Sequence, residues 1–182
     1  MPSLYEQLIS IDTNGSIEKD DMVKHIRQAT LIGGYTLAEV NSSKPWGAYL
    51  RIEDGEADRF TPEMFEGMSS EEARRGVADA PLSPKILLVS PGQRLSEQRH
   101  NRRAERWHFL TPGFYVKSKE VGDQTVYEAK PGDIVQYDQG EVHRLIGSPY
   151  AYTIVAEVWQ HSDATHPSDE DDIERFADDY VR

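Results

Sequence analysis

The sequence predicts an all-β domain with helical additions, and two observations carry this prediction. Seven short β-like runs follow one another along the chain, at 48–53, 85–90, 106–111, 114–118, 125–129, 134–137 and 151–160. Glycine, proline and aspartate separate these runs at short intervals. Short strands divided by turn signals favour a sandwich or barrel over βαβ units. We therefore place a β-barrel at residues 44–160.

Residues 1–43 are predicted to form an N-terminal helical arm. The segment SLYE at 3–6 has the form of a capping box. After Ser16, a candidate N-cap, apolar residues recur at roughly helical spacing as far as Ile26. Gly33 and Gly34 then end the helical region.

Two further segments are predicted to add helices to the barrel. Residues 54–84 are acidic, with helix starts at Thr61-Pro62 and at Ser69. This helical insertion is either a passive decoration or a lid over the site. Residues 161–182 are expected to contain a short C-terminal helix that starts near Ser168 and packs its apolar side on the barrel.

Composition excludes several classes of function. The 182-residue chain has a net charge of −12, which disfavours nucleic acid and anionic membranes as partners. It has no cysteine, so disulfides, thiolate metal ligands and cysteine nucleophiles are excluded. No apolar run approaches the ~20 residues of a membrane span, and the start MPSLYEQLIS lacks a secretory pattern. We expect a soluble, cytoplasmic protein.

Five arginines between Arg94 and Arg106 stand out against this acidic background. One interpretation is a solvated basic strand edge. The other is a positive rim for an anionic substrate, because the same segment carries candidate metal ligands.

The segment PGQRLSEQRHNRRAERWHFLTPG, residues 91–113, contains Gln98, His100 and Glu105. Residues two apart on a strand point to the same face, so Gln98 and His100 should project together. The segment PGDIVQYDQGEVHRLIG, residues 131–147, adds His143 from a distant hairpin. An amide oxygen, two imidazoles and a carboxylate make a mixed site for a divalent transition metal.

The spacing of these residues resembles the two cupin signatures. Gly92 is followed after five residues by Gln98, and then His100 and Glu105 fit H-x-H-x4-E with glutamine in place of the first histidine. In the second signature, Gly132 leads through the turn at 138–140 to His143. The resemblance implies a double-stranded β-helix, or jelly-roll barrel.

Further blocks resemble the cupin domain of type II phosphomannose isomerases, without the GDP-mannose pyrophosphorylase half. They include KPWGAYLRI at 44–52, VAEVWQ at 155–160 and EDDIERFADDYVR at 170–182. This resemblance implies one divalent metal ion, with zinc first and manganese, iron, cobalt or nickel as alternatives. It also implies interconversion of mannose 6-phosphate and fructose 6-phosphate. By analogy with other cupin barrels, we expect a homodimer.

Residues are carried over from this family position by position. The family's metal-ligand positions hold Gln98, His100, Glu105 and His143. Lys44 stands where the RPWG-like motif has arginine, and Arg103 and Arg144 fall on family arginines. These three are candidates for holding phosphate or neutralising an enediolate, and each could instead form a structural ion pair.

Aldose–ketose isomerisation moves a proton between adjacent carbons, and a metal stabilises the charge of the enediolate. Glu157 and Glu97 are the candidate bases, and Glu97 is also a candidate contact for the substrate. Glu157 shares strand parity with Val155 and Trp159, which predicts an interior position, whereas Glu97 has opposite parity to Gln98 and should point outward.

Two side chains near Glu105 have alternative interpretations. Trp107 shares the face of Glu105, as an apolar wall that is either a core aromatic or a platform for a sugar. His108 has the opposite parity and is predicted to lie on the surface.

Three functions follow from these patterns. The first is a metal-dependent isomerase of a sugar phosphate. The second is a sugar-binding cupin without turnover, and the third is an iron-dependent cupin oxygenase. Fold alone would not separate them.

Overall fold

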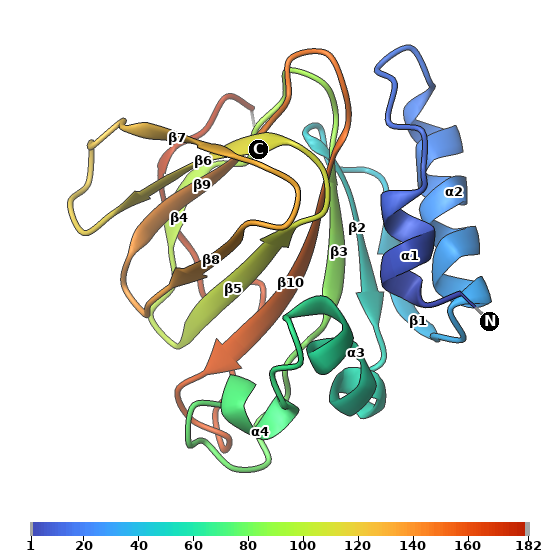
Figure 1. Cartoon of the computed structure of the whole chain (residues 1–182). Coiled ribbons are helices and arrows are strands. Elements are labelled where there is room, and N and C mark those ends of the chain that lie inside the picture. Colours follow the sequence, from blue (N-terminus) through green and yellow to red (C-terminus); the bar gives the residue numbers. More distant parts are fainter. Residues whose placement is uncertain (1, 181–182) are drawn as a thin grey trace.

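The computed structural model describes residues 2–180 and confirms the all-β prediction. Two antiparallel sheets form a jelly roll (Figure 1). The larger sheet contains β1 (Leu37–Asn41), β2 (Gly47–Ile52), β3 (Lys85–Val89), β10 (Thr153–His161), β5 (Arg103–Phe109) and β8 (Ile134–Tyr137), in that spatial order. The smaller contains β11 (Glu174–Ala177), β4 (Glu97–Arg99), β9 (Val142–Gly147), β6 (Gly113–Ser118) and β7 (Val126–Ala129).

The larger sheet separates two hydrophobic cores, and β3 shows how. Ile86 and Leu88 belong to the core beneath the helices, whereas Leu87 and Val89 belong to the core between the sheets. Successive side chains of a strand point to opposite faces, so a strand with a core on each side is apolar throughout. Residues 86–89 of β3, ILLV, have this composition.

Helices cover the outer face of the larger sheet and one end of it (Figure 1). None of the helices in the described chain is both long and apolar enough to cross a membrane. The helical elements of the described chain are α1 (Leu4–Ile9), α2 (Lys19–Ile32), the 3-10 turn η1 (Asp54–Glu56), α3 (Ala57–Met64) and α4 (Ser70–Ala73).

The N-terminal helices follow the prediction with one correction. Ser3 and Glu6 form the predicted capping box of α1. The N-cap of α2 is Glu18 rather than Ser16, because Asn14 accepts the backbone N–H of Ser16 in a turn that precedes the helix. β1 then pairs with β2, so the predicted helical arm also contributes an edge strand to the larger sheet.

In the insertion, the predicted helix start at Thr61-Pro62 is wrong. The turn η1 leads directly into α3, so this helix begins a turn earlier and contains Pro62. The second predicted start is correct, because Ser69 and Glu72 form a capping box at α4.

His108 faces away from the metal ligands, as predicted, but it is not on the surface. Its ring stacks on Tyr5 with centroids 5.8 Å apart, and Nδ1 donates to the carbonyl of Met64. The N-terminal helices and the insertion therefore bury a side chain whose strand parity alone indicated exposure.

The predicted C-terminal helix is wrong, because residues 174–177 form β11 beside β4. Asp172, whose charge favours a helix N-terminus, instead accepts the backbone N–H groups of Asn101 and Arg102. The open edge of β4 pairs with the chain that follows, and Arg175 lies opposite Gln98. Tertiary contacts thus override the local helix signal.

Candidate metal centre

Three of the predicted ligands meet inside the barrel. His100 follows β4, Glu105 lies on β5 and His143 on β9, and their ligand atoms all lie within 4.8 Å of one another. His100 Nε2 is 3.1 Å from Glu105 Oε1, and His143 Nε2 is 3.3 Å from Glu105 Oε2. All three residues are buried. The pairing of Gln98 with His143 across β4 and β9 brings the two sequence segments together.

The charge states of this cluster suit metal binding. Burial lowers the pKa of His100, although Glu105 opposes this, so the imidazole is neutral at neutral pH. Burial by itself would raise the pKa of Glu105, but the Arg103 guanidinium, which donates to Oε1 at 2.9 Å, outweighs it, and this pKa lies well below its usual value. A neutral imidazole and a carboxylate are the forms that bind a metal ion.

Two of the three residues present unpartnered atoms that suit a cation, whereas His100 Nε2 accepts from Arg103 Nη2 at 3.1 Å. Glu105 Oε2 and His143 Nε2 are buried without a hydrogen-bond partner, although buried polar atoms rarely lack one. The Nδ1 atoms of both histidines donate to backbone carbonyls, His143 to Glu141 at 3.0 Å and His100 to Asp172 at 2.6 Å. Both rings therefore turn Nε2 toward Glu105, as metal-binding histidines do.

Gln98, the fourth predicted ligand, lies beside the cluster with its amide nitrogen nearest. Its Oε1 accepts from Ser96 Oγ at 2.8 Å, and its Nε2 lies 3.4 Å from His100 Nε2. The two ends of an amide have nearly the same shape. A half-turn of the amide would bring the oxygen to the cluster and let the nitrogen donate to Ser96.

A cavity of about 80 Å³ opens beside Gln98 and Glu105. Its other charged lining residues are Lys44, Lys85, Arg103, Glu157, Glu170 and Arg175. Residues 54–84 contribute none of the lining within the described chain, so the structure does not support the insertion as a lid.

Glu157 lies in this cavity, in the interior position that its strand parity predicts. Its two carboxylate oxygens accept from the indole nitrogens of Trp107 and Trp159, each at 3.0 Å. Lys85 Nζ lies 3.8 Å from Glu157 Oε2. Burial, together with the negative charge of Glu105, raises the pKa of Glu157 to about 8, and Lys85 only partly offsets this.

Lys85 is a cavity residue that the sequence analysis missed. It is 3% exposed, and its ammonium lies 3.2 Å from the centre of the Trp159 ring and 3.1 Å from Glu170 Oε1. Lys85 has the same parity as Leu87, which faces the space between the sheets. The alternation of side chains along KILLV was therefore the sequence signal that could have placed Lys85 in the cavity.

Arg144, a predicted catalytic residue, does not reach the cavity. It follows His143 on β9, so its side chain points to the opposite face. Its Nε donates to the carbonyl of Leu95 at 2.6 Å, and Nη2 lies 3.1 Å from Asp179. The guanidinium therefore links the C-terminal segment beyond β10 to the smaller sheet.

Glu97 also lies outside the cavity, on the face of β4 opposite to Gln98. It is buried rather than exposed, because Gln124 Nε2 donates to it at 2.6 Å from the β6–β7 connection. The parity prediction is correct, but neither a base nor a substrate contact at the metal centre fits this position.

Of the remaining predicted residues, Lys44 lines the cavity and is half-buried. Arg103 also lines it, but its guanidinium bonds to Glu105 and Ser168. The Trp107 ring centre lies 5.4 Å from that of His143, so the predicted apolar wall stands beside the ligands.

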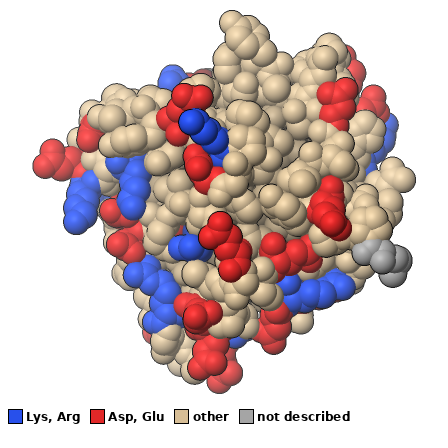
Figure 2. Space-filling view, in the orientation of Figure 1, with Lys and Arg blue, Asp and Glu red and all other residues tan. Residues whose placement is uncertain are grey.

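The predicted positive rim is largely neutralised. The carboxylate pairs are Arg94 with Asp179, Arg99 with Glu174, Arg102 with Asp169 and Arg103 with Glu105. Most of these acids come from the tail beyond β10. On the face drawn in Figure 2, basic and acidic side chains are likewise interspersed.

No family model and no curated protein sequence matches this chain. Among solved structures, the capsular polysaccharide assembling protein CapF from Staphylococcus aureus is similar to this chain. The structural match covers 95% of this chain, at 12% sequence identity and a TM-score of 0.53. The match covers 43% of CapF, so this chain spans less than half of the protein that it resembles.

Two other solved structures are weaker matches. A Cupin 2 conserved barrel domain protein from Salinispora arenicola has 21% identity and a TM-score of 0.39, over 48% of this chain and 69% of its own. A predicted oxalate decarboxylase from Thermotoga maritima has 15% identity and a TM-score of 0.44, over 70% of this chain and 93% of its own.

These structures do not support the narrower resemblance to type II phosphomannose isomerases, which stays a prediction. The likeness to CapF concerns the fold alone. Taken with the two antiparallel sheets and the buried His-Glu-His cluster, it gives this chain the cupin jelly-roll fold.

Proposed function

We propose that this protein is a metal-dependent aldose–ketose isomerase of a sugar phosphate, with mannose 6-phosphate and fructose 6-phosphate as the first pair to test. The observation that carries the proposal is that the Glu157 carboxyl lines the same small cavity as Gln98 and Glu105. When bound by this cluster, a divalent metal ion supplies Lewis-acid stabilisation of negative charge on carbonyl and hydroxyl oxygens.

Glu157 is the base in this proposal. It takes a proton from the hydroxyl-bearing carbon beside the substrate carbonyl and returns it to the former carbonyl carbon, while the hydroxyl proton passes to the former carbonyl oxygen. Two indole N–H groups hold its oxygens, so the carboxyl has a fixed direction. A pKa of about 8 is useful for this task, because a base that both takes and returns a proton works best near the ambient pH.

Lys44 and Lys85 replace Arg144 as the groups that hold the substrate phosphate. Both line the cavity, and Lys85 is buried there beside Glu157. An ammonium removed from water attracts an anion more strongly than an exposed one does. The likeness to CapF, a protein named for capsular polysaccharide assembly, supports a carbohydrate as substrate.

The test is conversion of mannose 6-phosphate by protein loaded with zinc or manganese. Fructose 6-phosphate should form, EDTA should stop its formation, and added metal should restore it. Glu157→Gln should lower kcat by about 100-fold or more with unchanged metal content. Glu63→Gln is the matched control, because Glu63 binds the Tyr35 hydroxyl beside the N-terminal helices and should leave activity unchanged.

Other outcomes would replace this proposal. Binding of sugar phosphates without turnover would indicate a sugar-binding cupin, and oxygen consumption by iron-loaded protein would indicate an oxygenase. Parental turnover by Glu157→Gln would show that another group is the base.

A further inference from the structure

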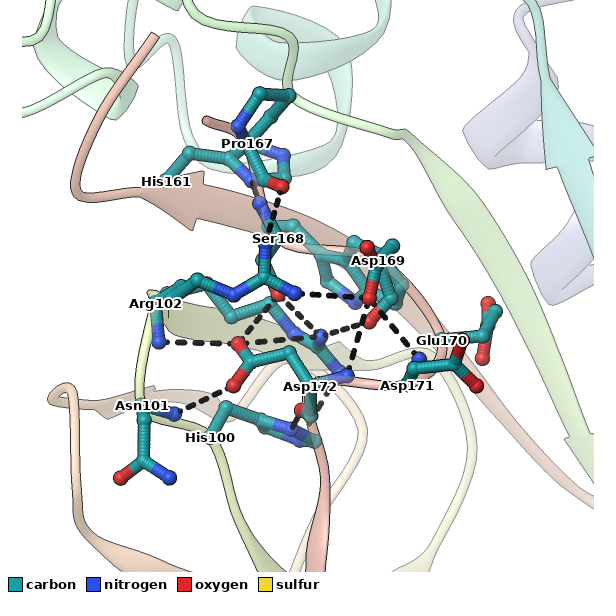
Figure 3. A network of polar contacts seen from close by, with 12 residues as sticks. His100, Asn101, Arg102, His161, Pro167, Ser168, Asp169, Glu170, Asp171 and Asp172 are labelled. Atoms are coloured by element: carbon teal, nitrogen blue, oxygen red, sulfur yellow. Dashed lines mark hydrogen bonds and ion pairs between the residues drawn. The ribbon is translucent and has the colours of Figure 1, made fainter. Parts of the chain in front are cut away.

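The turn that follows His100 is tied to a distant part of the chain. The carboxylate of Asp172 accepts the backbone N–H groups of Asn101 at 2.9 Å and Arg102 at 3.0 Å (Figure 3). Asp172 is 7% exposed, so water competes little for these bonds. One side chain from the tail therefore holds the backbone immediately after a metal ligand.

The backbone of Asp172 also acts on the His100 ring itself. Its carbonyl accepts from Nδ1 at 2.6 Å, which fixes the tautomer and leaves the lone pair on Nε2. That Nε2 is the atom that lies 3.1 Å from Glu105 Oε1. The same tail residue thus sets both the position of the turn and the orientation of the ligand.

Ser168 extends these contacts to a second ligand. Its hydroxyl donates to Asp172 Oδ2 at 2.6 Å and accepts from Arg103 Nη1 at 2.7 Å. The Arg103 guanidinium lies 3.6 Å from the centre of the Trp159 ring, and its Nε donates to Glu105 Oε1 at 2.9 Å. The chain of contacts therefore runs from the tail to Glu105.

We propose that Asp172 and Ser168 are positioning residues of the metal centre, so that metal affinity depends on the tail segment 168–172. β11, which follows this segment, supports the same conclusion because it pairs with β4 and places Arg175 opposite Gln98. The inference requires the metal centre, but it holds for any reaction carried out there.

Cobalt(II) is a suitable probe, because its visible absorption reports coordination without any substrate. Metal-free parent, Asp172→Asn and Ser168→Ala are titrated with cobalt(II), and urea unfolding of each metal-free protein is measured in parallel. Asp172→Asn should weaken cobalt affinity by about 10- to 100-fold, and Ser168→Ala should weaken it less. Asp171→Asn is the control with the same charge change at an exposed neighbour, and its affinity should equal that of the parent.

The outcomes separate positioning from plain structural support. A purely structural role would lower the free energy of unfolding and leave the cobalt affinity of the folded protein unchanged, and parental affinity in both variants would overturn the inference. If Asp172→Asn does not fold, Ser168→Ala decides, because it leaves the backbone contacts of Asp172 in place. A parent that binds no cobalt would instead remove the metal centre itself.

Discussion

Replacing Glu157 by glutamine should change how the stability of the metal-free protein depends on pH. The pKa of this carboxyl rises from 4.5 to about 8 on folding, because of its burial and the negative charge of Glu105. The folded protein therefore holds this proton more tightly than the unfolded chain does. The stabilising contribution of the protonated group is fully present below about pH 4.5 and is lost as the pH rises through about 8.

The size of the effect follows from these two pKa values. Each pH unit within the window lowers the free energy of unfolding by up to about 1.4 kcal/mol, which amounts to about 5 kcal/mol across the whole window. Glutamine cannot ionise, so the free energy of unfolding of the variant lacks this dependence on pH. It also offers one oxygen to two indole donors, so it loses one hydrogen bond, at a cost of about 1–3 kcal/mol that does not vary with pH.

The assay is urea unfolding of parent and Glu157→Gln in EDTA, from about pH 5 to about pH 8.5. Subtracting the two free energies of unfolding removes the titration of groups that both proteins share. At the lowest pH the variant should have a lower free energy of unfolding than the parent. As the pH rises, the free energy of unfolding of the variant should increase relative to that of the parent by several kcal/mol. A difference that stays constant with pH would refute the assignment of a raised pKa to Glu157.

Two further substitutions test the ligand set and the backbone. His143→Ala should lose most of its bound metal while circular dichroism shows that the fold survives, because β9 keeps its pairing with both neighbours; full metal occupancy would contradict this ligand assignment. Gly47→Ala should lower the free energy of unfolding by about 3 kcal/mol or more, since a Cβ there would lie 1.9 Å from the carbonyl oxygen of Leu88. Gly55→Ala, which meets nothing within 4 Å, is its control in the same urea titration, and equal losses in the two variants would contradict the steric argument.

The metal cluster could be predicted because its residues lie in two short segments, 91–113 and 131–147, whose spacing resembles the two cupin signatures. The two-residue period of a strand placed Gln98 and His100 on one face, and the signature spacing added Glu105 and His143. The same period placed Glu157 in the interior. Applied to Arg144, it would have excluded that residue, because neighbours on a strand cannot both point to the metal centre.

The tail could not be predicted in this way. Its acidic residues are also good helix starters, and nothing local shows that Asp172 binds the backbone after His100 instead. Pairing of β11 with β4 joins residues that are far apart in the sequence. A short segment of this kind takes the structure that its surroundings impose.

The charges inside the barrel are the strongest argument that the cavity has a chemical role. Lys85, Arg103, Glu105 and Glu157 are each 5% exposed or less. Removing such groups from water costs several kcal/mol apiece, and apolar side chains of similar size would fill the same space at lower cost. Stability therefore does not explain them. Buried charged groups around a cavity are typical of functional sites, and here the pKa of Glu105 is lowered while that of Glu157, the carboxyl that we assign as the base, is raised.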